Sequence, residues 1–135
     1  MKYRITSETK VVDNITLHRI KCVTAFGDVG CGEKGGWIES EKNLSQSGNA
    51  WVDENATVSG NAWVNENATV YGNAVVSENA TVSENAVVSE NATVYGNAVV
   101  SEHAWVSGNA WVGGNARIGG HAWVSGKARV FENAT

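Results

Sequence analysis

The chain has no proline, one methionine and two cysteines among its 135 residues, and it contains no long apolar run. Cys22 and Cys31 are too few for the disulfide framework of a small secreted domain, which favours a reducing compartment. The polar first ten residues lack the apolar stretch of a secretion signal. No segment approaches the roughly 18 consecutive apolar residues of a membrane-spanning helix. We therefore predict a cytoplasmic protein with no membrane partner.

Basic residues are scarce in the second part of the chain. Residues 47–135 contain three lysines and arginines against eight acids, whereas residues 1–46 contain seven against six. All three bases of the second part lie between Arg117 and Arg129. A rod with an acidic middle and a basic end favours end-directed association. Because no large basic patch is present, nucleic acid is not an expected partner.

A six-residue phrase, Asn-Ala-x-Val-x-Gly/Glu, runs from Asn49 to the last residue without insertion or deletion. Alanine occupies all fifteen positions of its phase, and the aliphatic residue is valine everywhere except Ile118. A fixed short period is typical of a solenoid. Within Ala-x-Val, the first and third residues face one side of a strand, so we predict them inside and the middle residue outside. The following residues turn a corner, where we expect asparagine to adopt the left-handed backbone conformation.

The recurring Val-x-x-x-Ala spacing resembles the hexapeptide-repeat family over residues 49–135. This resemblance implies an all-β fold, a left-handed parallel β-helix of triangular section, with 18 residues per coil and about five coils. A narrower resemblance, carried by His18, Gly27-Asp28, residues 35–39, residues 43–46 and Gly48-Asn49-Ala50, is to short bacterial and phage hexapeptide-repeat proteins named as transferases or as uncharacterised. Such names follow the fold and carry little weight on function.

Residues 1–48 do not repeat, and we predict them to form an N-terminal β cap on the β-helix of residues 49–135. Residues 3–6 and 15–26 have the composition of strands. Ile38 and Leu44 fall in the alanine phase, so the coil register is expected to begin before Asn49. The sequence stops in mid-phrase at Thr135, and we expect this uncapped end to pair with another copy.

Wrapping the repeat at 18 residues per coil sorts the outward residues into three columns. Trp105 and Trp123 become direct neighbours, with Trp111 and two arginines close by around the prism. Exposed tryptophan with arginine is typical of an interface hot spot. The predicted interface consists of Trp105, Trp111, Arg117, Trp123, Arg129 and Phe131. The alternative is that these tryptophans only stabilise the sheet by stacking across coils.

Histidines and glutamates also fall into columns. His103 and His121 lie 18 residues apart and should stack on one corner. The family resemblance implies metal-binding histidines at subunit boundaries, but zinc needs three protein ligands and a third is missing. We therefore predict neither a metal nor a cofactor, and treat both histidines as surface residues. Three glutamates share another corner, where we favour a solvated edge over a site for a cation or a basic partner: Glu66, Glu84 and Glu102.

Three further residues are potential metal ligands in the cap. His18, Cys22 and Cys31 match no zinc-finger spacing, and we expect them to pack within the N-terminal region. A disulfide between the two cysteines is left open by the sequence.

The resulting functional hypothesis is a non-enzymatic, self-associating β-helix, a structural scaffold or protein-interaction module that forms homo-oligomers through its C-terminal coils. No catalytic residue is predicted. One alternative is a hexapeptide acyltransferase, for which the resemblance implies a catalytic histidine and loops around the acyl donor. No loop interrupts this repeat, and a general base needs a pocket. Another alternative is a protein that sequesters a nucleotide or other small ligand between arginine and tryptophan.

Overall fold

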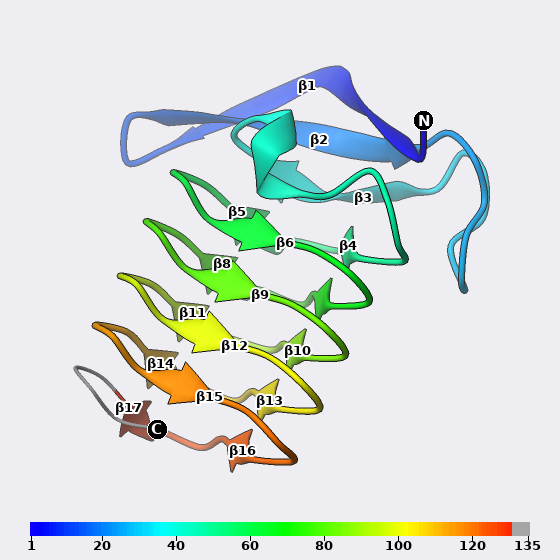
Figure 1. The fold of residues 1–135 in the computed structure, drawn as a ribbon. Coiled ribbons are helices and arrows are strands. Elements are labelled where there is room, and N and C mark those ends of the chain that lie inside the picture. Colours follow the sequence, from blue (N-terminus) through cyan, green and yellow to red (C-terminus); the bar gives the residue numbers. More distant parts are fainter. Residues whose placement is uncertain (131–135) are drawn as a thin grey trace.

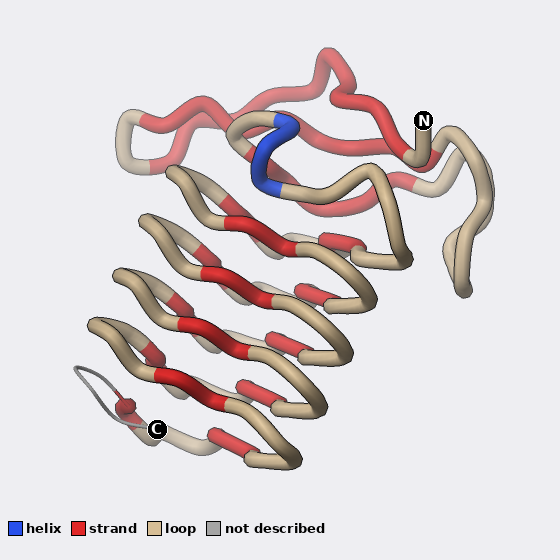
Figure 2. The backbone as a smooth tube through the Cα atoms, in the orientation of Figure 1, coloured by secondary structure: helices blue, strands red, loops and turns tan. Residues whose placement is uncertain are grey.

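Within residues 1–130, which the computed structural model describes, the chain is a β-solenoid, and three N-terminal strands that pair antiparallel with one another extend one of its sheets at one end. Figure 1 shows the coils stacked along one axis and the N-terminal strands lying across the first coil. Apart from one short helical turn, the tube in Figure 2 consists of strands and connections. The predicted all-β class is confirmed.

The N-terminal sheet contains β1 (Tyr3–Val12), β2 (Ile15–Cys22) and β3 (Lys34–Ile38), and the 3-10 turn η1 (Glu41–Asn43) follows. β1 extends beyond the predicted residues 3–6, and β2 ends at Cys22 instead of Phe26. A tight turn explains the length of β1. Asp13 and Asn14 have φ values of 51° and 66°, and two consecutive positive φ angles are what a type I′ hairpin turn requires.

Each phrase of the repeat contributes one two-residue strand, made of the outward residue and the aliphatic residue that follows it. Each strand pairs in parallel with the strand three phrases further on, as Val87 and Val88 do with Trp105 and Val106. The strands are β4 (Trp51–Val52), β5 (Thr57–Val58), β6 (Trp63–Val64), β7 (Thr69–Val70), β8 (Val75–Val76), β9 (Thr81–Val82), β10 (Val87–Val88), β11 (Thr93–Val94), β12 (Val99–Val100), β13 (Trp105–Val106), β14 (Trp111–Val112), β15 (Arg117–Ile118), β16 (Trp123–Val124) and β17 (Arg129–Val130).

Three sheets form the sides of the solenoid. The eight-stranded face has the order β1-β2-β3-β5-β8-β11-β14-β17, the five-stranded face β16-β13-β10-β7-β4, and the four-stranded face β15-β12-β9-β6. In Figure 1 the strands of the four-stranded face run from left to right in front, and the chain returns behind them while descending. This path is a left-handed coil. The predicted left-handed parallel β-helix of about five coils is therefore confirmed.

Alanine and valine fill the interior as predicted. Every repeat alanine from Ala50 to Ala116 and every repeat valine from Val52 to Val112 is 0 % exposed. Alternation along each short strand sends the residue between them outward. Trp51 is the exception to the outward prediction: it is only 4 % exposed because the N-terminal segment covers it. The rings of Tyr3 and Phe26 contact it edge-on, at centroid distances of 6.4 and 5.3 Å.

At the corners, the left-handed residue is the one before asparagine, so our assignment of that conformation to asparagine was wrong. Six glutamates in this position have φ between 56° and 60°, and glycines occupy the remaining corners. Asparagine instead links neighbouring coils. The Asn67 N–H donates to the Glu84 carbonyl at 2.9 Å, and the Asn61 side-chain amide donates to that of Asn79 at 3.2 Å. An amide can donate and accept at once, so it can continue such a ladder.

The coil register begins before Asn49, as predicted, but in a different phase. Ile38 pairs with Val58 and Leu44 with Val64, so both residues occupy the valine position and not the alanine position. Both pairs are more widely separated along the sequence than the equivalent pairs of later coils, because the corner that follows Leu44 is longer than the others.

The longer corner fastens the N-terminal strand to the first coil. It places the Gln46 side-chain amide against β1, where the oxygen accepts the N–H groups of Lys2 and Tyr3 at 2.8 and 3.2 Å. The amide nitrogen donates to the Tyr3 carbonyl at 3.1 Å. β3 lies before residue 48 and β5 after it, yet both strands belong to one sheet. The sheet therefore continues across the predicted domain boundary after residue 48, and that boundary stays a prediction. Within residues 1–130, no helix is long and apolar enough to cross a membrane.

Candidate interaction surface

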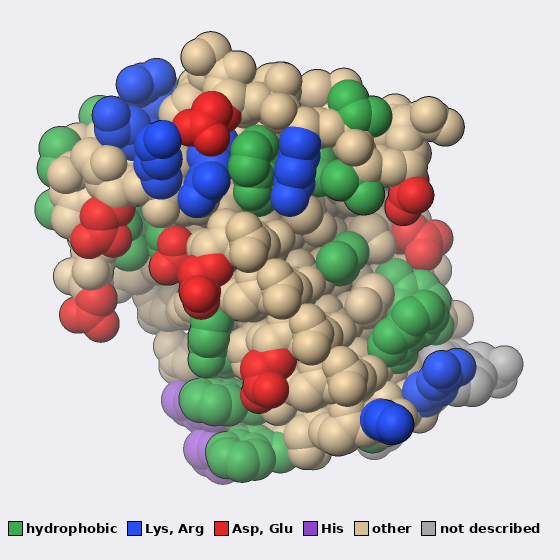
Figure 3. All heavy atoms as spheres, turned by 180° about the vertical axis from the view of Figure 1, so that it is seen from behind, with side chains coloured by type: hydrophobic (Ala, Val, Ile, Leu, Met, Phe, Trp, Pro, Cys, Tyr) green, Lys and Arg blue, Asp and Glu red, His purple; other side chains and the backbone are tan. Residues whose placement is uncertain are grey.

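Two tryptophans and two histidines form an exposed aromatic strip on the five-stranded face. Its members are His103, Trp105, His121 and Trp123. The indole rings stack with centroids 5.4 Å apart and planes 12° from parallel, and the imidazole rings stack at 4.9 Å and 7°. Figure 3 shows two histidine side chains beside hydrophobic ones toward the end of the solenoid. The predicted stacking of both pairs is confirmed.

The strip follows directly from the repeat. His-Ala-Trp occurs twice, one coil apart, and β13 pairs with β16 so that Trp105 lies opposite Trp123. Adjacent strands are about 4.8 Å apart, which suits offset stacking of aromatic rings. Because side chains alternate along a strand, the imidazole and the indole of each His-Ala-Trp segment lie on the side opposite to its alanine.

The strip is the most exposed part of its face. Trp105 is 38 % and Trp123 70 % exposed, whereas Thr69 and Val87, which hold the equivalent positions in earlier coils, are half-buried. A rigid, exposed aromatic surface is typical of a binding site for another molecule.

A second cluster lies on the eight-stranded face around Trp111. The Arg129 guanidinium lies over the Trp111 ring, 5.3 Å from its centroid, and the Tyr95 ring meets it edge-on at 5.8 Å. The proximity of Trp111 and Arg129 was predicted, but Tyr95 was missed. Gly113 holds the position of Tyr95 in the next coil, and a Cβ at Gly113 would overlap the Tyr95 ring. This glycine was the sequence feature that could have indicated where the Tyr95 ring lies.

The remaining predicted interface residues lie elsewhere. Arg117 is exposed on β15, in the four-stranded face, where it pairs with Val99. The structure therefore does not bring Arg117 onto the faces that carry Trp105 or Trp111. Phe131 lies outside the described residues.

The three glutamates predicted to share a corner do so. The N–H groups of Asn67 and Asn85 donate to the carbonyls of Glu84 and Glu102, which places Glu66, Glu84 and Glu102 in successive coils. All three side chains are exposed. Among residues 1–130, no three histidine, cysteine, aspartate or glutamate side chains converge to hold a metal ion.

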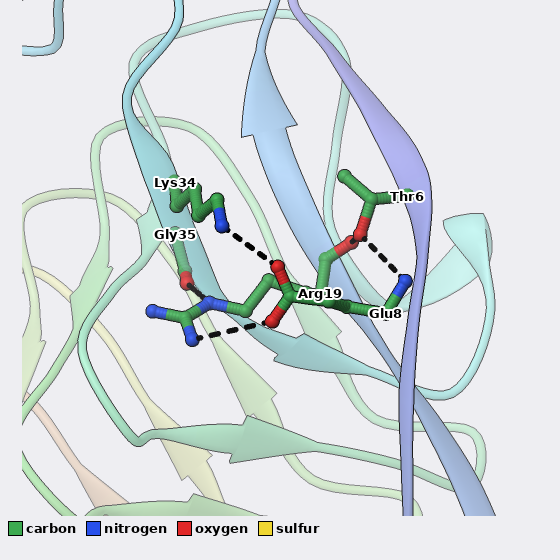
Figure 4. A network of polar contacts seen from close by, with 5 residues as sticks. All are labelled: Thr6, Glu8, Arg19, Lys34 and Gly35. Atoms are coloured by element: carbon green, nitrogen blue, oxygen red, sulfur yellow. Dashed lines mark hydrogen bonds and ion pairs between the residues drawn. The ribbon is translucent and has the colours of Figure 1, made fainter.

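Ion pairs organise the outer face of the N-terminal sheet. Figure 4 shows the Glu8 carboxylate between Lys34 and Arg19: Lys34 Nζ donates a hydrogen bond to it at 2.8 Å, and Arg19 Nη1 forms an ion pair with it at 3.9 Å. The hydrogen bond from Lys34 lowers the pKa of the Glu8 carboxyl. Arg19 Nε also donates to the Gly35 carbonyl at 2.8 Å. The cations of Lys10 and Arg19 lie over the Trp37 ring, 4.6 and 5.2 Å from its centroid.

The cysteines are free thiols, one buried and one exposed. Burial raises the pKa of the Cys22 thiol, whose sulfur donates to the Thr24 carbonyl at 3.3 Å. Cys31 Sγ donates to the Val23 carbonyl at 3.0 Å. His18, which we had grouped with them, lies half-buried on β2.

Lys2 is a buried cation at the edge of a shallow cavity of about 230 Å³. Its Nζ donates to the Ala50 carbonyl at 2.7 Å and lies 4.7 Å from the centroid of the Phe26 ring. Burial lowers its pKa to about 8. Two more cavities, of about 330 and 380 Å³, lie between the N-terminal region and the solenoid. None of these three cavities is lined by a histidine.

The middle of the solenoid matches a known repeat. Residues 88–102 match the family described as YdcK Beta solenoid repeat. The chain is also similar to the Uncharacterized acetyltransferase YdcK of Escherichia coli (strain K12), with 36 % identity over 59 residues. That match covers 38 % of this chain and 18 % of the relative, so the chain spans less than a fifth of the relative's length. These similarities and the stacked coils fit a hexapeptide-repeat type of β-helix.

Proposed function

We propose that this chain is a non-enzymatic β-solenoid that associates with a second copy of itself through the aromatic strip and the Trp111–Arg129 cluster, and so serves as a structural scaffold or interaction module. The observation that carries this function is the stacked, exposed pair Trp105 and Trp123. A tryptophan that is 70 % exposed leaves a large apolar area in water, and burying such area is the main source of association free energy.

A second copy is a suitable partner because it presents the same spacing. Rows of rings separated by the distance between strands can pack against an identical row related by a two-fold axis, as in most homodimers. The histidines beside the tryptophans would form part of a polar rim around the apolar centre. The residues that support this association lie on the side faces of the solenoid.

Sedimentation equilibrium across a range of protein concentrations tests the proposed association. Threonine occupies the outward position in other coils, so replacing both Trp105 and Trp123 by threonine should leave the fold intact. We expect this double variant to dissociate at least about 30-fold more readily, since central aromatic residues contribute about 2 kcal/mol or more to an interface.

Trp63→Thr is the matched control. Trp63 is also exposed, at 48 %, but it lies on the four-stranded face. We expect it to leave association unchanged. A wild-type protein that stays monomeric at every concentration, or a double variant that associates like the wild type, would refute self-association through this strip.

Acyl transfer is a second candidate because the similar Escherichia coli protein is named as an uncharacterized acetyltransferase. Acyl transfer requires a positioned general base and a pocket for the acyl donor. His103 and His121 lie on the exposed strip, and no cavity described above is lined by either. Isothermal titration with acetyl-CoA distinguishes the two candidates: saturable binding that is lost in His103→Ala or His121→Ala would favour the transferase.

A further inference from the structure

The tip of the β1–β2 hairpin overhangs the solenoid and forms one side of a partly open cavity of about 380 Å³. In Figure 1 the hairpin turn lies above the corners that follow β5 and β8. Val12, Ile15 and Leu17 line the cavity from the hairpin, and Val75 lines it from the eight-stranded face. Cavities of roughly 300–1,000 Å³ with mainly apolar walls are characteristic of sites for small organic ligands.

The sequence builds this overhang through the turn at Asp13 and Asn14. The turn pairs Val12 with Ile15 across the hairpin end, and Leu17 lies two residues further along β2 on the same side as Ile15. These aliphatic side chains therefore project toward one face. Leu17 is only 2 % exposed, but Val12 is still 43 % exposed, so the hairpin leaves part of its apolar surface uncovered.

The polar lining of the cavity has one sign of charge. Asp13 at the hairpin turn and Glu78 at a solenoid corner contribute carboxylates, and no lysine, arginine or histidine lines the cavity. Within residues 1–130, neither carboxylate forms an ion pair. Lys10 projects from the same side of β1 as Val12, but its ammonium group lies over the Trp37 ring. Both carboxylates are therefore available to a cation.

We propose that this cavity binds a small amphipathic organic cation, an ammonium group on an aliphatic or aromatic body. The apolar body would lie between the hairpin side chains and Val75, and the ammonium group would hydrogen-bond the carboxylates of Asp13 and Glu78. Hydroxyl groups of Ser59 and Ser77, which also line the cavity, supply further acceptors. An organic anion of the same shape would face two like charges.

Titration with phenethylammonium, followed by methyl chemical shifts in NMR spectra, tests the site. Neutral 2-phenylethanol and anionic 3-phenylpropanoate are matched probes of similar shape. We expect phenethylammonium to shift the methyl signals of Val12, Ile15, Leu17 and Val75 at millimolar concentration. The alcohol should bind about tenfold or more weakly, as expected for loss of a charge-assisted hydrogen bond. The carboxylate should cause no shift.

Two variants test the carboxylates without changing shape. Asp13→Asn and Glu78→Gln keep the positive φ angles of 51° and 60° accessible, and each should weaken phenethylammonium binding about tenfold. Glu84→Gln is the matched control, because Glu84 has the same backbone conformation, φ 58°, at a different corner. It should leave the affinity unchanged.

Filling the cavity provides an independent measurement. Tryptophan occupies the outward position of the repeat at five strands, so Val75→Trp is compatible with the fold and should abolish binding. Equal binding of the cation and the carboxylate, an absence of shifts in the wild type, or unchanged affinity in both carboxylate variants would overturn the assignment. These outcomes are independent of the oligomeric state measured for the aromatic strip.

Discussion

Replacing Glu84 by glycine is expected to stabilise the solenoid by about 0.5–1 kcal/mol. Glu84 has φ 58°, a left-handed conformation that costs a residue with a Cβ about 1–2 kcal/mol. Glycine removes that cost, but its greater freedom in the unfolded chain returns about 0.4–1 kcal/mol. The difference gives the expected gain in the free energy of unfolding.

Steric and electrostatic effects act in the same direction. At the glycine corners, an added Cβ would approach the backbone of the next coil closely, as at Gly72, where it would lie 2.9 Å from the Glu90 nitrogen. Removing the Glu84 carboxylate also removes its repulsion with the carboxylates of Glu66 and Glu102 in the two neighbouring coils. Glu84→Ala isolates the two effects, because it removes the charge but keeps the Cβ in the left-handed conformation.

The measurement is denaturant unfolding followed by far-UV circular dichroism, for the wild type, Glu84→Ala and Glu84→Gly. The reverse change, Gly96→Ala, should destabilise, since φ there is 63° and the new Cβ would lie 2.8 Å from the Gly114 nitrogen. If Glu84→Gly is no more stable than Glu84→Ala, backbone strain at the corners is not the cause and the reasoning fails.

Three further predictions concern the core and the N-terminal region. Val88→Ala removes two methyl groups at a site that is 0 % exposed and should cost about 2–3 kcal/mol in chemical unfolding; a loss below half that would indicate a core that relaxes around the change. Gln46→Ala removes three hydrogen bonds to Lys2 and Tyr3 and should speed amide exchange at Tyr3, whereas unchanged protection would show that the start of β1 is held by other contacts. Burial lowers the pKa of Lys2 from 10.5 to about 8, so between pH 8 and pH 10.5 the unfolded chain binds more protons than the folded chain. The free energy of unfolding should therefore rise from pH 8 to 9 and fall as the pH drops through 8. Lys2→Met should flatten that rise, and an equally steep rise in the variant would contradict its assignment to Lys2.

The solenoid and its faces were predictable from the sequence because the repeat is uninterrupted. Once alanine and valine are placed inside, the three-phrase period of the coil determines which outward side chains become neighbours. The stacking of Trp105 on Trp123 and of His103 on His121 follows from this rule alone. Their function as an interface does not follow, since stacking within one chain needs no partner.

The missed features depend on contacts outside the repeat or on backbone conformation. Glutamate and asparagine are consecutive at many corners, and the sequence does not reveal which of the two takes the left-handed conformation. The glycines that replace glutamate at the other corners were the available evidence. Trp51 has the same sequence context as the exposed tryptophans but is buried by residues from the N-terminal region. The cavity under the hairpin was also missed, because its two sides come from segments with no sequence relationship.

Because each coil contributes one strand to each of three faces, the position of a phrase within its coil determines the direction in which its outward side chain points from the solenoid axis. The hairpin cavity lies on the eight-stranded face, and the aromatic strip lies on the five-stranded face. Removing one whole coil between them would shorten the molecule and keep both directions. Removing a single phrase would turn everything after it by about a third of a revolution and move the strip to the four-stranded face. Gain or loss of whole coils thus changes the separation of the two proposed binding surfaces, and gain or loss of single phrases changes the angle between them.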